Sequence, residues 1–265
     1  MLSYPQIDPV IFSIGPLAVR WYGLMYVLGF IASYLLVQKQ IRRHRQEALA
    51  AHFDNLNLLL ILSVIIGGRL GYVLFYNLGY YFNHPAEIIA TWEGGMSFHG
   101  ACLTLLLVGL WFCRRHHLDF WTVADFYTAT APIGLCLGRI GNFLNGELYG
   151  RVTDVPWAMV FPGGGPSPRH PSQIYESLLE GVLLFLILWL NREKPWQGRW
   201  PHGAIAALFL IGYGLIRIFV ENFREPDEQL GFLFGPITMG QLLSSAMIVG
   251  GLIIWWYRKR AMMRR

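Results

Sequence analysis

Charged residues are scarce in this sequence. Of its 265 residues, only 14% are charged and 54% are apolar, whereas ordinary soluble domains are about 25% charged. This shortage excludes a disordered or fibrous chain. Together with 17 Phe, 13 Tyr and 10 Trp, it predicts an integral membrane protein.

Cysteine is also scarce, and its spacing suggests no site. Cys102, Cys113 and Cys136 lie inside apolar stretches, without the paired spacing of a disulfide framework or of a zinc or redox motif. The chain also lacks a glycine-rich nucleotide loop and clustered His/Cys ligands, so we expect no metal and no cofactor. The net charge of +5 falls in short clusters between apolar runs, and we therefore expect no nucleic-acid partner.

Seven apolar stretches have about the ~20 residues that a helix needs to cross a bilayer. They lie near residues 21–38, 56–76, 96–113, 121–141, 173–190, 203–222 and 237–257. The fourth is the weakest because it contains Asp125 and Pro132. The predicted fold is an all-α integral membrane protein with seven transmembrane helices.

Basic residues mark alternate ends of these stretches. Fourteen of the 21 follow the first, third, fifth and seventh spans: Lys39, Arg42, Arg43, Arg45, Arg114, Arg115, Arg192, Lys194, Arg199, Arg258, Lys259, Arg260, Arg264 and Arg265. Because cytoplasmic loops retain Lys and Arg, the pattern places the N-terminus outside, in the periplasm, and the C-terminus in the cytoplasm.

The regions outside the spans are short, apart from one loop. We expect residues 1–265 to form a single membrane domain, with residues 142–172 inserted as a small periplasmic head between the fourth and fifth helices. Within this loop, Val155 to Phe161 is apolar enough for a short strand. The first twenty residues lack the basic start of a cleavable signal peptide, and we expect them to lie along the outer interface.

The seven remaining basic residues are all arginines on the predicted outer side: Arg20, Arg69, Arg139, Arg151, Arg169, Arg217 and Arg224. An arginine within the membrane costs at least ~2.5 kcal/mol, so Arg69, Arg139 and Arg217 are expected to face the protein interior. Guanidinium groups match phosphate oxygens, which predicts an anionic phospholipid head group as ligand. The alternative is that Arg217 pairs with Glu221 and the other two extend toward head groups.

Other polar residues fall at the same level. His99 is able to take a proton near neutral pH, although a histidine there is more often an interfacial hydrogen-bonding residue. Tyr22 and Tyr26 are typical of an interfacial aromatic belt. Arg217, Glu221 and Arg224 have the spacing of one helix face. Glu176 and Glu180, one turn apart, are either counter-charges or an independent proton site.

Residues 138–150, GRIGNFLNGELYG, resemble the signature of the prolipoprotein diacylglyceryl transferases. The combination of arginine, two asparagines, glutamate and spaced glycines at the exit of a membrane helix is specific. Similar segments cover nearly the whole chain: FSIGPLAVRWYGLMY at 12–26, GMSFHG at 95–100, RHPSQIYE at 169–176 and GLIRIFVENFREPD at 214–227.

The resemblance implies a bacterial inner-membrane enzyme of lipoprotein biosynthesis with its active site toward the periplasm. Such an enzyme moves the diacylglyceryl group of phosphatidylglycerol to the lipobox cysteine thiol in the signal peptide of a preprolipoprotein, and releases glycerol 1-phosphate. The implied catalytic residues are His99, Arg139 and Arg217. The implied substrate-binding residues are Tyr22, Asn142, Glu147, Gly150, Glu221 and Arg224.

Two other functions fit parts of the pattern. A transporter or channel for anions or lipid head groups also places polar residues within spans, but the inner halves of spans one, three, five and seven are nearly all apolar. Another phospholipid head-group enzyme would use the same phosphate site, and it leaves residues 138–150 unexplained.

Overall fold

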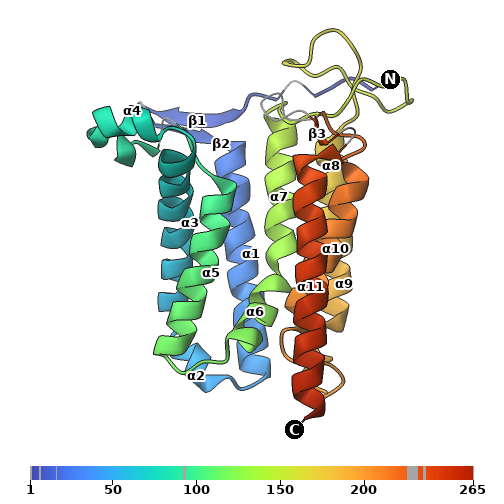
Figure 1. The fold of residues 1–265 in the computed structure, drawn as a ribbon. Coiled ribbons are helices and arrows are strands. Elements are labelled where there is room, and N and C mark those ends of the chain that lie inside the picture. Colours follow the sequence, from blue (N-terminus) through green and yellow to red (C-terminus); the bar gives the residue numbers. More distant parts are fainter. Residues whose placement is uncertain are drawn as a thin grey trace. The chain divides into compact units, whose positions relative to one another are not determined.

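The computed structural model describes residues 2–5, 7–15, 17–91, 94–225, 232–234 and 237–264. Every stretch that the sequence marks as a span is helical there (Figure 1). Five of them are single helices: α1 (Trp21–Arg43), α3 (Phe53–Phe75), α5 (Phe98–Arg115), α10 (Ala204–Val220) and α11 (Met239–Met263).

The other two stretches are interrupted helices. The fourth consists of α6 (Phe120–Thr128) and α7 (Ala131–Leu144), and Pro132 lies in the first turn of α7, where a missing N–H does no harm. The fifth runs through α8 (Ser172–Glu176), the π-helix η3 (Ser177–Leu183) and α9 (Leu184–Asn191).

Four of the described helical segments are long and apolar enough to cross a membrane: Trp21–Arg43, Phe53–Phe75, Ser172–Asn191 and Met239–Met263. The remaining predicted spans form shorter or less apolar helices. A helical membrane protein is therefore confirmed, whereas the count of seven spans and the placement of the termini stay predictions.

The segments outside the spans hold a hairpin near the N-terminus, and the expected strand at residues 155–161 needs correction. Residues near the N-terminus form an antiparallel hairpin of β1 (Val10–Ile14) and β2 (Leu17–Arg20), and Gly15 supplies the positive φ of its turn. Residues 155–161 form no strand. Met159 makes isolated bridges with Leu2 and Arg169, because a turn closed by the Ala158 N–H on the Val155 carbonyl interrupts extended pairing.

Short helices and a second hairpin complete the described chain. They are α2 (Glu47–Ala50), α4 (Leu78–Asn83), the 3₁₀-helix η1 (Pro85–Ile89), and the paired strands β3 (Phe232–Phe234) and β4 (Ile237–Thr238).

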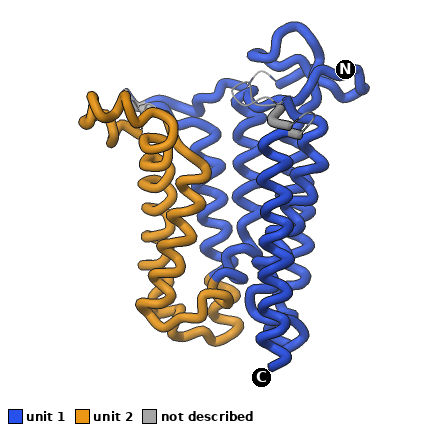
Figure 2. The backbone as a smooth tube through the Cα atoms, in the orientation of Figure 1, with its two compact units in different colours: residues 1–37, 124–265 blue, residues 38–123 orange. Residues whose placement is uncertain are grey.

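The chain divides into two compact units (Figure 2). Unit 1 comprises residues 1–37 and 124–265, and unit 2 comprises residues 38–123. The boundaries fall inside α1 and α6. The predicted single membrane domain and its insertion at 142–172 stay predictions.

In unit 2, α3 and α5 pack closely through glycines. A Cβ on Gly100 would lie 2.4 Å from the Gly67 carbonyl oxygen, and one on Gly71 would lie 2.7 Å from the Gly100 Cα. Small residues of this kind let membrane helices approach one another.

In unit 1, close glycine contacts join the helices that carry the candidate site. A Cβ on Gly181 of η3 would lie 2.4 Å from the Cys136 Cβ of α7, and one on Gly214 of α10 would lie 2.7 Å from the Ser244 carbonyl oxygen of α11. These contacts fix α7 against η3 and α10 against α11, and α10 and α11 run side by side in Figure 1.

Asp125, the buried carboxylate in the fourth apolar stretch, caps the start of α10. The Asp125 carboxylate accepts hydrogen bonds of 2.7, 3.0 and 3.0 Å from the N–H groups of Gly203, Ile205 and Ala206. Helix N-terminal N–H groups lack partners within their own helix. Asp125 therefore supplies a cap from a distant segment, which explains a carboxylate in an apolar run.

Candidate active site

Three arginines of unit 1 surround one buried carboxylate. Glu176, fully buried at the end of α8, lies 2.7 Å from Arg139 Nε, 2.8 Å from Arg217 Nη1 and 3.4 Å from Arg224 Nε. We call Arg139, Arg217 and Arg224 the arginine cluster. Its members come from α7, from α10 and from the segment after α10, so the fold brings together charges far apart in sequence.

Two further carboxylates complete the balance of charge. Glu180 is fully buried, 3.5 Å from Arg217 Nη1, and Glu221 Oε2 lies 3.2 Å from Arg217 Nη2 and 3.6 Å from Arg224 Nη1. Three guanidinium groups thus face three carboxylates, as buried charges require. The ion pairs of Glu176 fit a counter-charge, and the two interpretations of Glu180 stay open.

Arg139 is the most accessible member of the arginine cluster. Its side chain is 19% exposed, against 10% for Arg217 and for Arg224. A guanidinium has five N–H donors, and the ion pair with Glu176 uses the Nε edge of Arg139. An anion that reaches the cluster is therefore expected to meet Arg139 first.

The helix that carries Glu176 and Glu180 widens where the charges lie. Glu180 belongs to the π-helix η3, which begins directly after Glu176 and abuts α7 at Gly181. One helical turn before Arg139, the Cys136 thiol lies 3.1 Å from the Ser177 hydroxyl, next to Glu176. π-Helical turns are rare and are often found at functional sites.

The expected single helix face of Arg217, Glu221 and Arg224 needs correction. The helix α10 ends at Val220, Glu221 caps it, and Arg224 lies beyond it, in an antiparallel bridge with Gly150. The three side chains still meet, because the chain turns back over the helix end. Arg151 Nε donates to the Arg224 carbonyl oxygen at 2.7 Å and secures this turn.

Gly150 is required for space and not for an unusual backbone angle. The positive φ angles of this turn belong to Gly146 and Leu148. A Cβ on Gly150 would lie 2.3 Å from the Phe223 carbonyl oxygen and 2.8 Å from the His170 Cβ. Glycine therefore allows the signature segment to approach the chain that carries Arg224.

Glu147 orders the turn after α7. Its Oε1 accepts hydrogen bonds from Asn142 Nδ2 at 2.9 Å and from Asn145 Nδ2 at 3.2 Å. Tyr4 donates from its hydroxyl to the Phe143 carbonyl at 2.6 Å, and burial raises the pKa of that hydroxyl, which favours the donating form.

Tyr22 faces the signature segment. A Cβ on Gly141 would lie 2.9 Å from Tyr22 Cδ2, and the hydroxyl groups of Tyr22 and Tyr26 lie 3.0 Å apart. This packing sets Tyr22 against the residue that precedes Asn142 and gives it a role beyond an interfacial belt.

Two of the candidates from the sequence lie in unit 2. His99 is exposed in the first turn of α5, with its ring 5.9 Å from that of Phe98. Arg69 is buried and donates to the backbone carbonyls of residues 87, 88, 94 and 95. Arg69 therefore holds together the segment that precedes α5, and within unit 1 three of the seven arginines form a cluster.

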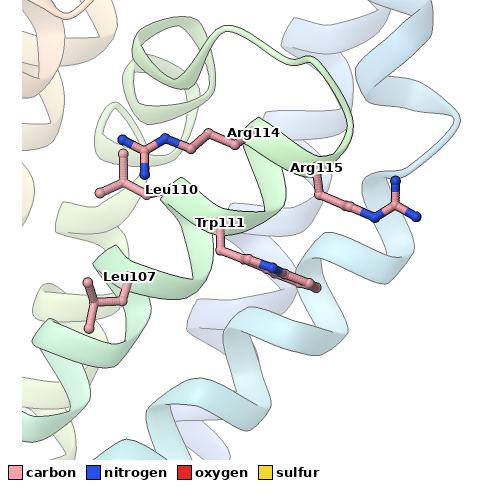
Figure 3. Close-up of a pocket in the computed structure, with 5 residues that line it drawn as sticks. All are labelled: Leu107, Leu110, Trp111, Arg114 and Arg115. Atoms are coloured by element: carbon pink, nitrogen blue, oxygen red, sulfur yellow. The ribbon is translucent and has the colours of Figure 1, made fainter.

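The C-terminal part of α5 lines a cavity of 470 Å³ (Figure 3). Its lining residues are Leu107, Leu110, Trp111, Arg114 and Arg115, at the opposite end of α5 from His99. Tryptophan beside basic residues is typical of a membrane interface.

One polar residue of the site was missed from the sequence. Thr238, 4% exposed, caps α11 and donates from Oγ1 to Glu221 Oε1 at 3.1 Å. The signal was present, because Thr238 followed by Gln241 before an apolar run is the capping-box pattern of a helix start.

Comparisons with known proteins agree with the signature. The family model described as "Prolipoprotein diacylglyceryl transferase" matches residues 9–257. Relatives named phosphatidylglycerol–prolipoprotein diacylglyceryl transferase include that of Desulfotalea psychrophila, 64% identical over 97% of this chain and 95% of the relative. That of Geobacter sulfurreducens is 53% identical over 95% of each chain, and that of Aliivibrio salmonicida is 51% identical over 97% of this chain and 90% of the relative. This chain belongs to the prolipoprotein diacylglyceryl transferase family.

Proposed function

We propose that this protein transfers the diacylglyceryl group of phosphatidylglycerol to the lipobox cysteine of a preprolipoprotein. The product is a thioether, and glycerol 1-phosphate is released. The observation that carries the proposal is the arginine cluster beside the signature turn, in a chain of this family. Guanidinium groups held by carboxylates at a helix exit suit a lipid phosphate.

The reaction requires charge stabilisation at the leaving group. The thiolate sulfur attacks the glycerol carbon that bears the phosphate, and the carbon–oxygen bond breaks with its electron pair going to the phosphate. N–H donors that already point at this growing charge lower the barrier most. Arg139 and Arg217 are assigned to the phosphate, because Arg139 is the more accessible and Arg217 contacts all three carboxylates.

The thiol must lose its proton before attack. Free cysteine has a pKa near ~8.5, so a base raises the thiolate fraction. His99 is assigned as that base, and it takes up the thiol proton. Tyr22 and Asn142 bind the head group. Glu147, Gly150, Glu221 and Arg224 hold the geometry of the binding site through the contacts described above.

The ends of α11 indicate the side of the membrane. The helix begins next to Glu221 of the site and ends with the basic residues Arg258, Lys259 and Arg260. Because basic ends lie in the cytoplasm, the arginine cluster lies toward the periplasm of a bacterial inner membrane. The proposed topology has seven spans, with the N-terminus in the periplasm.

The proposed reaction is tested with purified protein in vesicles that contain phosphatidylglycerol. We expect glycerol 1-phosphate to appear only when a lipobox peptide is supplied, in equal amount to the lipidated peptide. The matched control peptide has serine in place of the lipobox cysteine. Head-group release with the serine peptide, or without any peptide, would identify a different head-group enzyme.

His99→Gln tests the assignment of the base. Glutamine preserves hydrogen bonding but takes up no proton, so we expect turnover to fall by about 10²–10⁴-fold while phosphatidylglycerol binding is retained. The two proteins are compared for turnover and for phosphatidylglycerol binding at each pH. Equal turnover of the two proteins across pH would reject His99 as the base.

A further inference from the structure

Thr238, at the start of α11, contacts Glu221, the carboxylate that pairs with two members of the arginine cluster. Its Oγ1 lies 3.1 Å from Glu221 Oε1, and both residues are buried, at 4% and 6% exposure. The other oxygen, Glu221 Oε2, faces Arg217 and Arg224. The Glu221 carboxylate therefore bridges one hydroxyl and two guanidinium groups.

The direction of the Thr238 hydroxyl is fixed by the helix that it caps. Its oxygen accepts the Gln241 N–H at 3.3 Å, while the Gln241 side chain accepts the Thr238 N–H at 3.2 Å. A hydroxyl has one proton to donate. Since the capping bond uses the oxygen as an acceptor, the proton is left for Glu221, and an ionised carboxylate accepts it.

The first turn of α11 is shaped around the same carboxylate. A Cβ on Gly240 would lie 2.9 Å from Glu221 Cδ and Oε1 and 3.0 Å from Oε2. Any larger residue would push the carboxylate away from Thr238 or from the arginines. The N-terminal end of a helix also favours a nearby negative charge.

We propose that Thr238 is a positioning residue for phosphate binding, which acts by holding Glu221, so that Glu221 and Arg224 keep Arg217 oriented toward the lipid phosphate. This inference rests on the proposed function of the arginine cluster. It makes the start of α11, outside the signature segment, part of the machinery that orients the site.

Three substitutions separate positioning from capping. Asp, Asn and Ser all cap helices well, so Thr238→Asp, Thr238→Asn and Thr238→Ser retain the acceptor for the Gln241 N–H. Asn and Ser also retain a donor for Glu221, whereas ionised Asp has none and repels Glu221. We expect Thr238→Asn and Thr238→Ser to keep transfer near the wild-type rate, and Thr238→Asp to lose about tenfold to a hundredfold.

The pH dependence provides a readout that capping alone does not change. In Thr238→Asp, two adjacent carboxyl groups near Arg217 and Arg224 compete for a proton, and a protonated carboxyl is again a donor. The ratio of Thr238→Asp to Thr238→Asn activity should therefore rise as the pH falls. Equal rates of the two variants at every pH would overturn the inference.

A double-mutant cycle keeps the test informative if Thr238→Asp does not fold. Thr238→Val lacks both donor and acceptor, and it should lower transfer by a smaller factor in a Glu221→Gln background than in the wild type, because residues that act through one another are not additive. The same factor in both backgrounds would overturn the inference.

Arg139→Ala, measured in parallel, separates the two claims. Full transfer by Arg139→Ala would refute the proposed site and the role of Thr238 with it. If Arg139→Ala is inactive but Thr238→Asp transfers at the wild-type rate, the role of Thr238 alone is refuted.

Discussion

Arg139→Ala is expected to abolish diacylglyceryl transfer while the protein still inserts and folds. Arg139 is the most exposed member of the arginine cluster and contacts Glu176 through Nε. Removing one preorganised donor to a developing oxyanion lowers turnover by about 10²–10³-fold, and loss of a full positive charge is expected to reach at least that. The measurement is the rate of lipidated peptide formation in vesicles with phosphatidylglycerol.

Two variants serve as controls for this loss. Arg139→Lys retains the charge without the planar fork that matches phosphate, and it should fall between the wild type and alanine. Arg20→Ala removes an exposed arginine from the outer side and should leave transfer unchanged. Full activity of Arg139→Ala would remove Arg139 from the phosphate site.

Glu176→Gln is expected to reduce both stability and transfer. Glu176 has no exposed surface and lies within 3.4 Å of all three guanidinium groups of the arginine cluster. Removing one partner of a buried ion pair costs about 3–5 kcal/mol of unfolding free energy, because the remaining charges are uncompensated. Thermal unfolding in detergent measures the first effect, and transfer by the folded fraction measures the second.

Glu225→Gln is the matched control. Glu225 makes an ion pair of 2.8 Å with Arg169 but is 49% exposed, and exposed pairs contribute about 0–1 kcal/mol. We expect little change in unfolding temperature or in transfer. Equal stability of the Glu176→Gln and Glu225→Gln proteins would show that Glu176 does not hold the arginines.

The membrane character and the positions of the helices followed from hydropathy alone. The breaks within them did not. Pro132 lies at a helix start inside an apolar run, and the π-helix η3 depends on packing of Gly181 against Cys136, which is a contact between segments distant in sequence. Asp125 made the fourth stretch the weakest predicted span, because its three N–H partners lie about 80 residues further along the chain and sequence spacing did not reveal them.

The candidate site was predictable in its residues and less so in its contacts. The free-energy cost of placing arginine in a membrane singled out Arg139 and Arg217. In the structure both lie beside Glu176. Sequence did not distinguish them from Arg69, since an interior arginine satisfied by backbone carbonyls looks the same in sequence as one that binds a ligand. Thr238 was missed because its partner Glu221 lies 17 residues earlier in the chain, and that spacing does not predict a contact.

The most direct test of the account is a structure of the protein with phosphatidylglycerol bound. We predict the lipid phosphate beside the arginine cluster, with its oxygens about 2.7–2.9 Å from the guanidinium nitrogens of Arg139, as in charge-assisted hydrogen bonds. A phosphate bound elsewhere, with Arg139, Arg217 and Arg224 still occupied by their carboxylates alone, would contradict it.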